Sequence, residues 1–287
     1  MSKNKEIKVQ TLKIPKIILI TAKFLEVIAP KLAIKFAAKL FTTPIKHKIP
    51  KREFQMDDES IQDEILIPSI NKKIVVYKYG QGDKKILLIH GWSGRGTQLY
   101  KIANELVNLG YQTISFDAPA HGKSSGNNTI MTEFISSIIE IEKQFGPFKF
   151  AIGHSLGGMA LLNAIKTNFK VKKTVIIGSG DIIQDIIDDF IKKLKLKPEV
   201  GIKLRYHFEK KYNSKMDYYS ASNAAKEVTI PVLIIHDEND DDVNVKAAYH
   251  INENLKNSEL MITKNLGHRK ILGNTEVIKR IVEYLKE

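Results

Sequence analysis

A serine lies at the centre of a glycine-rich sextet whose spacing could position a nucleophile. Residues Gly153 to Gly158 (GHSLGG) follow a short apolar run at 148–152 and precede a helical pattern at 159–169. So tight a turn between a strand and a helix strains the serine backbone, and glycines on both sides let the helix approach the sheet. Ser155 would then stand exposed at a helix N-terminus, where backbone N–H groups can hold a developing oxyanion. The sextet therefore predicts nucleophilic chemistry at Ser155.

A nucleophilic serine needs a base, and the base needs an acid that orients it. The continuous apolar run at 231–235 predicts a buried parallel strand, and a loop with four aspartates follows it at 237–242. Another strand is expected at 259–263, followed by a Gly-His step that ends in His268. We expect the acid in the aspartate loop and the base at His268, with a helix from 274 to 286 behind it.

The elements that must position these residues follow an alternating pattern. Short apolar strands, such as 86–89 and 113–116, alternate with helical segments of 3.6-residue period, such as 99–109 and 134–145. This alternation predicts an α/β fold with a mostly parallel sheet that helices cover on both faces. Ligands bind such sheets at the carboxyl ends of the strands, where all of the motifs fall.

From about Lys73 to its C-terminus the chain resembles the α/β-hydrolase superfamily. Five motifs carry the resemblance: His90-Gly91-Trp92, Phe116 to Gly122 (FDAPAHG), the serine sextet, the aspartate loop and Gly267-His268. Their combination is similar to bacterial esterase-like or lysophospholipase-like members. The resemblance implies an α/β-hydrolase fold with a mostly parallel central sheet flanked by helices. It also implies a small helical lid at about 181–227. We expect the hydrolase domain at 54–287, after a basic helical segment at 1–53 that the charge pattern indicates.

The resemblance also implies roles for individual residues. It makes Ser155 the nucleophile and His268 the base. It places His90-Gly91-Trp92 on the oxyanion loop, so that the backbone N–H groups of Trp92 and Leu156 form the oxyanion hole.

Several aspartates compete for the role of the acid. The family pattern favours Asp240, because Val243 follows it at the expected spacing, whereas Asp237 stands where the family usually has glycine. Asp241 and Asp242 are interpreted as solvated loop charges. Asp181 is a second candidate, but we favour its interpretation as the N-cap of a helix that begins at Ile182.

The remaining histidines are interpreted as structural. His90 and His121 are expected to form hydrogen bonds beside the site, and His154 is expected to pack under the sextet. His207, His236 and His250 have no partner pattern in the sequence. No histidine, cysteine or carboxylate pattern indicates a metal, and the aspartate loop lacks the glycine and terminal glutamate of an EF-hand. The glycine-rich segments lack the spacing of nucleotide-binding loops, so no cofactor is expected.

The positive charge of the chain is concentrated at its N-terminus. Residues 1–53 hold 12 Lys and 1 Arg against 3 Glu, a net charge of +10 out of +13 for the 287 residues. Two helices are expected here, one over about 17–28 and another that begins at Pro30 and reaches about Phe41. Lys31, Lys35 and Lys39 would share one face of the second helix.

Two interpretations of this segment compete. We favour packing of its helices on the hydrolase core, with the lysines in solvent. The alternative is peripheral membrane contact through residues 11–42, with apolar side chains in the lipid boundary and lysines on anionic headgroups. Nucleic acid binding is not expected, because the segment is aliphatic and no nucleic-acid-binding motif accompanies it.

The absence of cysteine excludes disulfides and fits a reducing cytoplasm. The longest uncharged apolar stretch of the N-terminus, 17–22, is too short for a signal peptide or a transmembrane helix. We therefore expect a cytoplasmic protein, with membrane association as the alternative.

The expected activity is that of a serine hydrolase which cleaves a small-molecule carboxylic ester through an acyl-enzyme. An apolar acyl or lipid ester is favoured by the apolar lid segment. A thioesterase, an acyltransferase or a carbon–carbon bond hydrolase would use the same residues. A non-catalytic binding module of the same fold is the alternative from another class.

Overall fold

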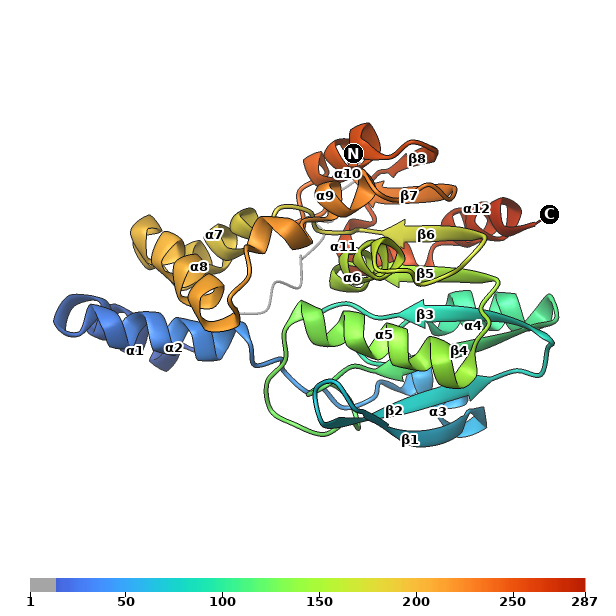
Figure 1. The fold of residues 1–287 in the computed structure, drawn as a ribbon, viewed down its shortest axis with the longest axis horizontal. Helices are drawn as coiled ribbons and strands as arrows, with labels where there is room; N and C mark the ends of the chain where they lie inside the picture. The colour runs from blue at the N-terminus through green and yellow to red at the C-terminus, as the bar shows by residue number, and fades with distance from the viewer. Residues whose placement is uncertain (1–13, 287) are drawn as a thin grey trace, which may run out of the picture.

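The fold is built on one eight-stranded sheet in the order β1-β2-β4-β3-β5-β6-β7-β8 (Figure 1). It is seen in a computed structural model that describes residues 14–286. Strand β2 pairs antiparallel with β1 and β4, and every other pair of neighbours is parallel. The strands are β1 (Ile61–Ile67), β2 (Lys72–Tyr79), β3 (Lys84–Ile89), β4 (Tyr111–Asp117), β5 (Phe150–His154), β6 (Lys173–Ile177), β7 (Val232–Asp237) and β8 (Ser258–Thr263).

The register of the parallel strands brings the predicted motifs to one edge. Ile89, the last residue of β3, lies opposite Gly153 near the end of β5. At the other side of the sheet, the last residues of β7 and β8 are also paired. The loops that follow β3, β5, β7 and β8 therefore leave the sheet at the same edge.

Helices cover both faces of the sheet because alternate strand residues are apolar on both sides. Ile86 and Leu88 of β3 pack in one cluster with α4 and α12, whereas Leu87 and Ile89 pack in another with α5 and α6. Helices α9 and α10 extend the second layer over β6 and β7. The helices of these layers are α3 (Phe54–Glu59), α4 (Tyr100–Asn108), α5 (Met131–Phe145), α6 (Leu156–Lys166), α9 (Ala221–Ala225), α10 (Lys246–Asn254), α11 (Gly267–Lys270) and α12 (Thr275–Leu285).

Four further helices form a separate layer beyond the carboxyl ends of the parallel strands, which we call the outer lobe (Figure 1). Two come from the N-terminal segment and two from the insertion between β6 and β7. Their shared core contains Ala37, Ile187 and Leu204, and the ring of Phe41 lies 5.1 Å from that of Phe190. The four helices are α1 (Lys16–Ile28), α2 (Pro30–Phe41), α7 (Ile183–Lys193) and α8 (Pro198–Tyr212).

The predicted fold class is confirmed: a mostly parallel sheet flanked by helices, with extra helices at the N-terminus. The N-terminal helices were expected to pack on the hydrolase core. Instead, α1 and α2 pack on the insertion between β6 and β7 rather than on the helical layers that cover the sheet. The predicted segment 11–42 begins outside the described residues, at 11–13. Among residues 14–286, no helix is long and apolar enough to cross a membrane.

Candidate active site

Ser155 occupies the tight turn between β5 and α6 that its sequence predicts. Its φ of 55° and ψ of −122° are a strained conformation for a residue with a side chain. The flanking glycines are required by close backbone approaches. A Cβ at Gly153 would lie 2.6 Å from the Gly157 carbonyl oxygen, and one at Gly157 would lie 2.5 Å from that of Ile89. The turn thus holds the Ser155 hydroxyl above the sheet, at the N-terminus of α6.

The loop after β3 is held on both sides of Trp92. The Gly91 N–H donates to Gln98 Oε1 at 3.1 Å, and the Ser93 N–H donates to His121 Nε2 at 3.0 Å. Within residues 14–286, neither the Trp92 N–H nor the Leu156 N–H donates to a protein acceptor. The two donors predicted for an oxyanion hole therefore have no acceptor among the described residues, and Trp92 and Leu156 line the same cavity as Ser155.

Two buried histidines support this loop, as expected for His90 and His121. The His121 ring accepts from Ser93 through Nε2, so its Nδ1–H donates to the Pro119 carbonyl at 3.1 Å. The His90 ring accepts from the Ala118 N–H and donates to the Gly91 carbonyl. Burial lowers the pKa of both rings, that of His121 to about 4. Both are therefore neutral at pH 7, and each holds a fixed tautomer.

The depressed pKa of His121 predicts a loss of stability in acid. Between its ordinary pKa of 6.5 and about 4, the unfolded chain binds a proton that the folded chain does not. The free energy of unfolding should therefore fall as the pH decreases through this window, by about 3 kcal/mol for this group at the acid end. Urea denaturation from pH 7 to pH 4 measures the fall. His121→Gln should lower the free energy of unfolding at pH 7 but make it depend less steeply on pH. An unchanged pH dependence in this variant would contradict the role given to His121.

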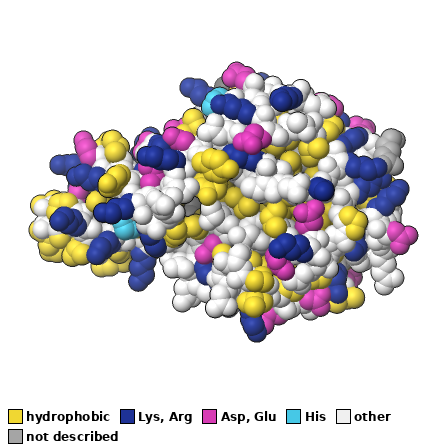
Figure 2. All heavy atoms as spheres, viewed as in Figure 1, with side chains coloured by type: hydrophobic (Ala, Val, Ile, Leu, Met, Phe, Trp, Pro, Cys, Tyr) yellow, Lys and Arg dark blue, Asp and Glu magenta, His cyan; other side chains and the backbone are white. Residues whose placement is uncertain are grey.

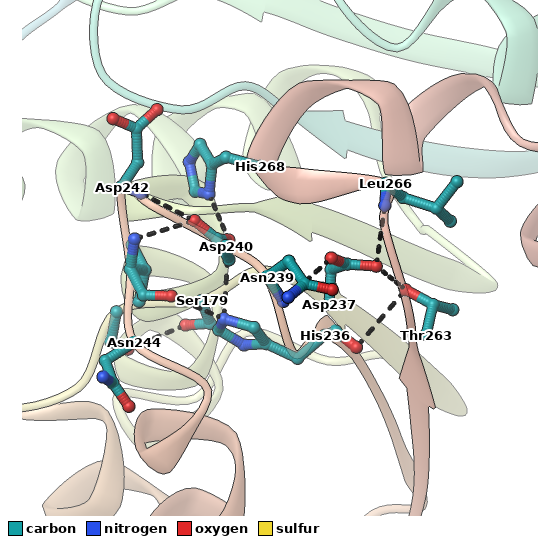
Figure 3. Close-up of polar contacts among 12 residues, drawn as sticks. Ser179, His236, Asp237, Asn239, Asp240, Asp242, Asn244, Thr263, Leu266 and His268 are labelled. Carbon is teal, nitrogen blue, oxygen red and sulfur yellow. Dashed lines mark hydrogen bonds and ion pairs between the residues drawn. The ribbon is translucent and has the colours of Figure 1, made fainter. Parts of the chain in front are cut away.

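The predicted acid and base are brought together across the ends of β7 and β8. His268 Nδ1 lies 2.7 Å from Asp240 Oδ2, and the N–H groups of Asp242 and Val243 both donate to Asp240 Oδ1 at 2.8 Å (Figure 3). The Asp240 side chain is only 1% exposed. Burial raises its pKa, but the hydrogen bond and the charge of His268 and the Val243 N–H outweigh burial, and the pKa lies below its ordinary value. An ionised Asp240 only accepts, so His268 donates to it from Nδ1, and in a neutral His268 ring Nε2 would be the proton acceptor.

A second histidine contacts the same carboxylate. His236 is fully buried, and its Nε2 lies 3.5 Å from Asp240 Oδ2 and 3.0 Å from the Val243 carbonyl oxygen (Figure 3). Since a carbonyl oxygen only accepts, the Nε2 proton of His236 points toward that oxygen, with the carboxylate nearby. The sequence shows no partner pattern for His236, because Asp240 lies on a loop whose conformation the local sequence does not reveal.

Asp237 has a structural position rather than a place beside His268. Its carboxylate accepts from the Thr263 hydroxyl at 2.7 Å and from the N–H groups of Leu266 and Asn239 (Figure 3). Asn239 adds another link, since its Oδ1 accepts from the Asn265 N–H at 3.0 Å. These bonds tie the loop that carries Asp240 to the loop that carries His268.

Ser155 and His268 line the same cavity, but among the described residues no hydrogen bond joins them. Such bonds are often long in the absence of substrate. His154 fixes the backbone of the base, because its Nε2–H donates to the His268 carbonyl at 3.0 Å. Burial lowers the pKa of His154 to about 3, so that this side chain stays a neutral donor under the turn, as its sequence position predicts.

Asp181, the second candidate for the acid, pairs with a different histidine. Its Oδ2 lies 2.5 Å from His250 Nδ1, and its Oδ1 accepts from the Ser222 N–H at 2.7 Å. The interpretation as the N-cap of the helix after Ile182 was wrong: that helix has no side-chain cap, and Asp181 binds the first turn of α9 instead. The sequence shows no partner pattern for His250, because 69 residues separate it from Asp181.

A cavity of about 2790 Å³ opens above Ser155 and extends under the outer lobe. Ligand sites of small-molecule enzymes usually have about 300–1,000 Å³, so this cavity could hold an elongated molecule. Its floor contains Ser155, Asp240 and His268. Its walls combine apolar residues of the sheet layers with those of the outer lobe, among them Leu19, Phe41, Met159, Ile186, Phe190 and Phe208.

Known families and structures match this architecture. The family described as α/β hydrolase fold matches residues 84–196, and the family described as TAP-like protein matches residues 212–287. Together they span all of the loops described above. The chain therefore belongs to the α/β-hydrolase superfamily.

Three solved structures illustrate the likeness. An esterase from Pyrococcus furiosus is 19% identical with a TM-score of 0.65, covering 85% of this chain and 97% of that one. An esterase from Exiguobacterium antarcticum is 20% identical with a TM-score of 0.60, covering 76% and 97%. A bacterial membrane phospholipase A is 14% identical with a TM-score of 0.63, covering 94% and 96%. No curated protein matches the sequence.

These similarities establish no specific activity for this protein. At such identities they establish the shared fold, and with the family matches they support a hydrolase. The match to the phospholipase covers 94% of this chain, and a share this large must include part of the N-terminal helices.

Proposed function

We propose that this protein is a serine hydrolase that cleaves carboxylic esters with apolar acyl chains, with Ser155, His268 and Asp240 as its triad. The observation that carries the proposal is that the nucleophile and the acid–base pair lie in one apolar cavity. The strained Ser155 and the hydrogen-bonded His268–Asp240 pair share one cavity, and that cavity is large and has a mostly apolar surface.

In the proposed mechanism, Ser155 Oγ attacks the ester carbonyl carbon while His268 Nε2 takes its proton. Asp240 holds the imidazole in the required tautomer and stabilises its charged form. The carbonyl oxygen becomes an oxyanion between the Trp92 and Leu156 N–H groups, each worth about 3 kcal/mol in hydrolases with such donors. The tetrahedral intermediate collapses, and the alkoxide leaves with the proton from His268. Water, activated by His268, then attacks the acyl-enzyme and releases the carboxylic acid and Ser155.

The substrate class follows from the walls of the cavity. Phe41, Phe190 and Phe208 of the outer lobe line the same cavity as Ser155, so that an acyl chain could extend from Ser155 under the outer lobe. Burial of each methylene contributes about 0.8 kcal/mol to binding. The name of one structural neighbour, a membrane phospholipase A, agrees with a lipid-like ester.

A panel of 4-nitrophenyl esters from acetate to palmitate tests the proposal. We expect kcat/KM to rise by at least about tenfold from the acetate to the octanoate, because the longer chain buries apolar surface in the cavity. Phe190→Ala should lower kcat/KM for long esters by about three- to tenfold and leave the acetate nearly unchanged. A flat or falling profile with chain length would contradict the apolar acyl site.

Thioesters and an acyl acceptor in the same assays distinguish the related activities. A thioesterase would prefer the acyl thioester, and an acyltransferase would transfer the chain to the added alcohol instead of water. A non-catalytic module would turn over none of these substrates.

A further inference from the structure

The outermost helix of the molecule presents apolar side chains to solvent. Ile17, Ile20, Phe24, Val27 and Ile28 of α1 are between 59% and 75% exposed. Their spacing of three, four, three and one residues places all five on one side of a helix. We call these five residues the α1 face. Figure 2 shows hydrophobic side chains mixed with lysines over this end of the molecule.

The opposite side of α1 packs against the rest of the outer lobe, so the α1 face is a second apolar surface of the same helix. Ala22 is fully buried in the outer lobe, with Ile18 and Leu19 packed beside it. The Glu26 carboxylate accepts from the Lys197 N–H at 2.6 Å, which anchors α1 to the insertion. A helix fixed on one side with a contiguous apolar stripe on the other is typical of an interaction site.

The charge near the α1 face favours an anionic partner. Lys23, at one edge of the stripe, is half exposed but pairs with Glu26. Among the described residues, unshared positive charge comes from α2, whose exposed side carries Lys31, Lys35 and Lys39. A second copy of the chain would bring the same +10 segment against itself. An anionic lipid surface instead offers hydrocarbon to the stripe and phosphate groups to the lysines.

The length of α1 restricts how it can meet a bilayer. Its 13 residues span about 20 Å, which is less than the roughly 30 Å of a hydrocarbon core. The helix could therefore lie in the plane of the interface but not cross it. The other side of the α1–α2 pair lines the cavity, through Leu19, Leu40 and Phe41.

We propose that the α1 face docks this protein on anionic phospholipid bilayers, with α1 embedded in the plane of the headgroup region. Docking in this orientation brings the outer lobe, and the cavity beneath it, to the lipid surface. The proposal concerns binding alone and does not depend on hydrolytic activity.

The absence of cysteine from the chain permits a direct test. Phe24→Cys in the full chain carries an environment-sensitive nitrobenzoxadiazole label, and Ile61→Cys is the matched control on the edge strand β1. The two side chains are 60% and 64% exposed. With vesicles of phosphatidylcholine and phosphatidylglycerol at 3:1, the label at position 24 should shift to the blue and be quenched by shallow spin-labelled lipids. The label at position 61 should do neither. Equal responses at both positions, or none at position 24, would overturn the proposal.

Cosedimentation with the same vesicles supplies the second measurement. Phe24→Asp/Val27→Asp should lower the partition coefficient at least about tenfold, whereas Ile61→Asp should leave it unchanged. Replacement of Lys31, Lys35 and Lys39 by Glu should also weaken binding, and pure phosphatidylcholine should bind the parent chain weakly. A dimer in sedimentation velocity that Phe24→Asp/Val27→Asp dissociates, without vesicle binding by the parent chain, would assign the face to a second copy and overturn the proposal.

Discussion

Ser155→Ala should lower kcat for a reactive ester by at least about 10⁴-fold and leave the fold intact. The loss is expected because the hydroxyl is the only proposed nucleophile, and what remains is the smaller contribution of the oxyanion hole and binding. The fold should survive because alanine meets the same φ of 55° as serine, and the Ser155 N–H bond to the Ile177 carbonyl is kept. Steady-state kinetics together with circular dichroism measure both outcomes.

Ser137→Ala is the matched control for this change. Ser137 is buried in α5, where its hydroxyl donates to the Glu133 carbonyl, away from the cavity. Its removal should leave kcat unchanged. Activity of Ser155→Ala near that of the control would refute the proposed nucleophile.

The second large effect is a contrast between two neighbouring aspartates. Asp240→Asn should lower kcat by about 10³- to 10⁴-fold, because an amide group can donate to His268 Nδ1 and so favour the wrong tautomer. Asp237→Asn should change kcat by less than about tenfold. It should instead lower the free energy of unfolding by about 1–3 kcal/mol, since its carboxylate accepts from Thr263 and Leu266 across two loops.

Kinetics and urea denaturation of the same two proteins separate these effects. The reverse ranking, with the larger loss of kcat in Asp237→Asn, would move the acid to Asp237. A large loss of kcat in Asp181→Asn, with Asp240→Asn active, would assign the role to the Asp181–His250 pair.

The sequence predicted those parts of the site whose chemistry is local. The glycine spacing around Ser155 predicts its strained turn, because only glycine tolerates the close backbone approaches at positions 153 and 157. The parallel sheet followed from apolar runs alternating with helical segments. The loop positions of Asp240 and His268 followed from the strands that precede them.

Contacts between distant segments were not predictable in this way. The bonds from Asp237 to Thr263 and from Asn239 to Asn265 depend on how two loops fold over the sheet edge. Likewise, the approach of His236 to Asp240 and the pairing of His250 with Asp181 have no spacing signal in one sequence. The strand at 61–67 was not assigned, because it joins the sheet only as the edge partner of β2.

The N-terminal helices show the same limit at the level of packing. Their bounds at Pro30 and Phe41 follow from helix-forming residues and the proline position. Their partner does not, because an apolar face such as that around Ala37 fits any complementary surface. The structure places that face against the insertion, and it leaves the second apolar face of α1 exposed.

The most direct test of the central claim is labelling of the purified protein with a fluorophosphonate, followed by mass spectrometry of the modified peptide. An activated serine is phosphonylated, whereas ordinary surface hydroxyls are inert. We predict a single adduct on Ser155, absent from Ser155→Ala and strongly reduced in Asp240→Asn. An adduct on another serine, or no adduct on folded protein with and without added lipid, would contradict the account.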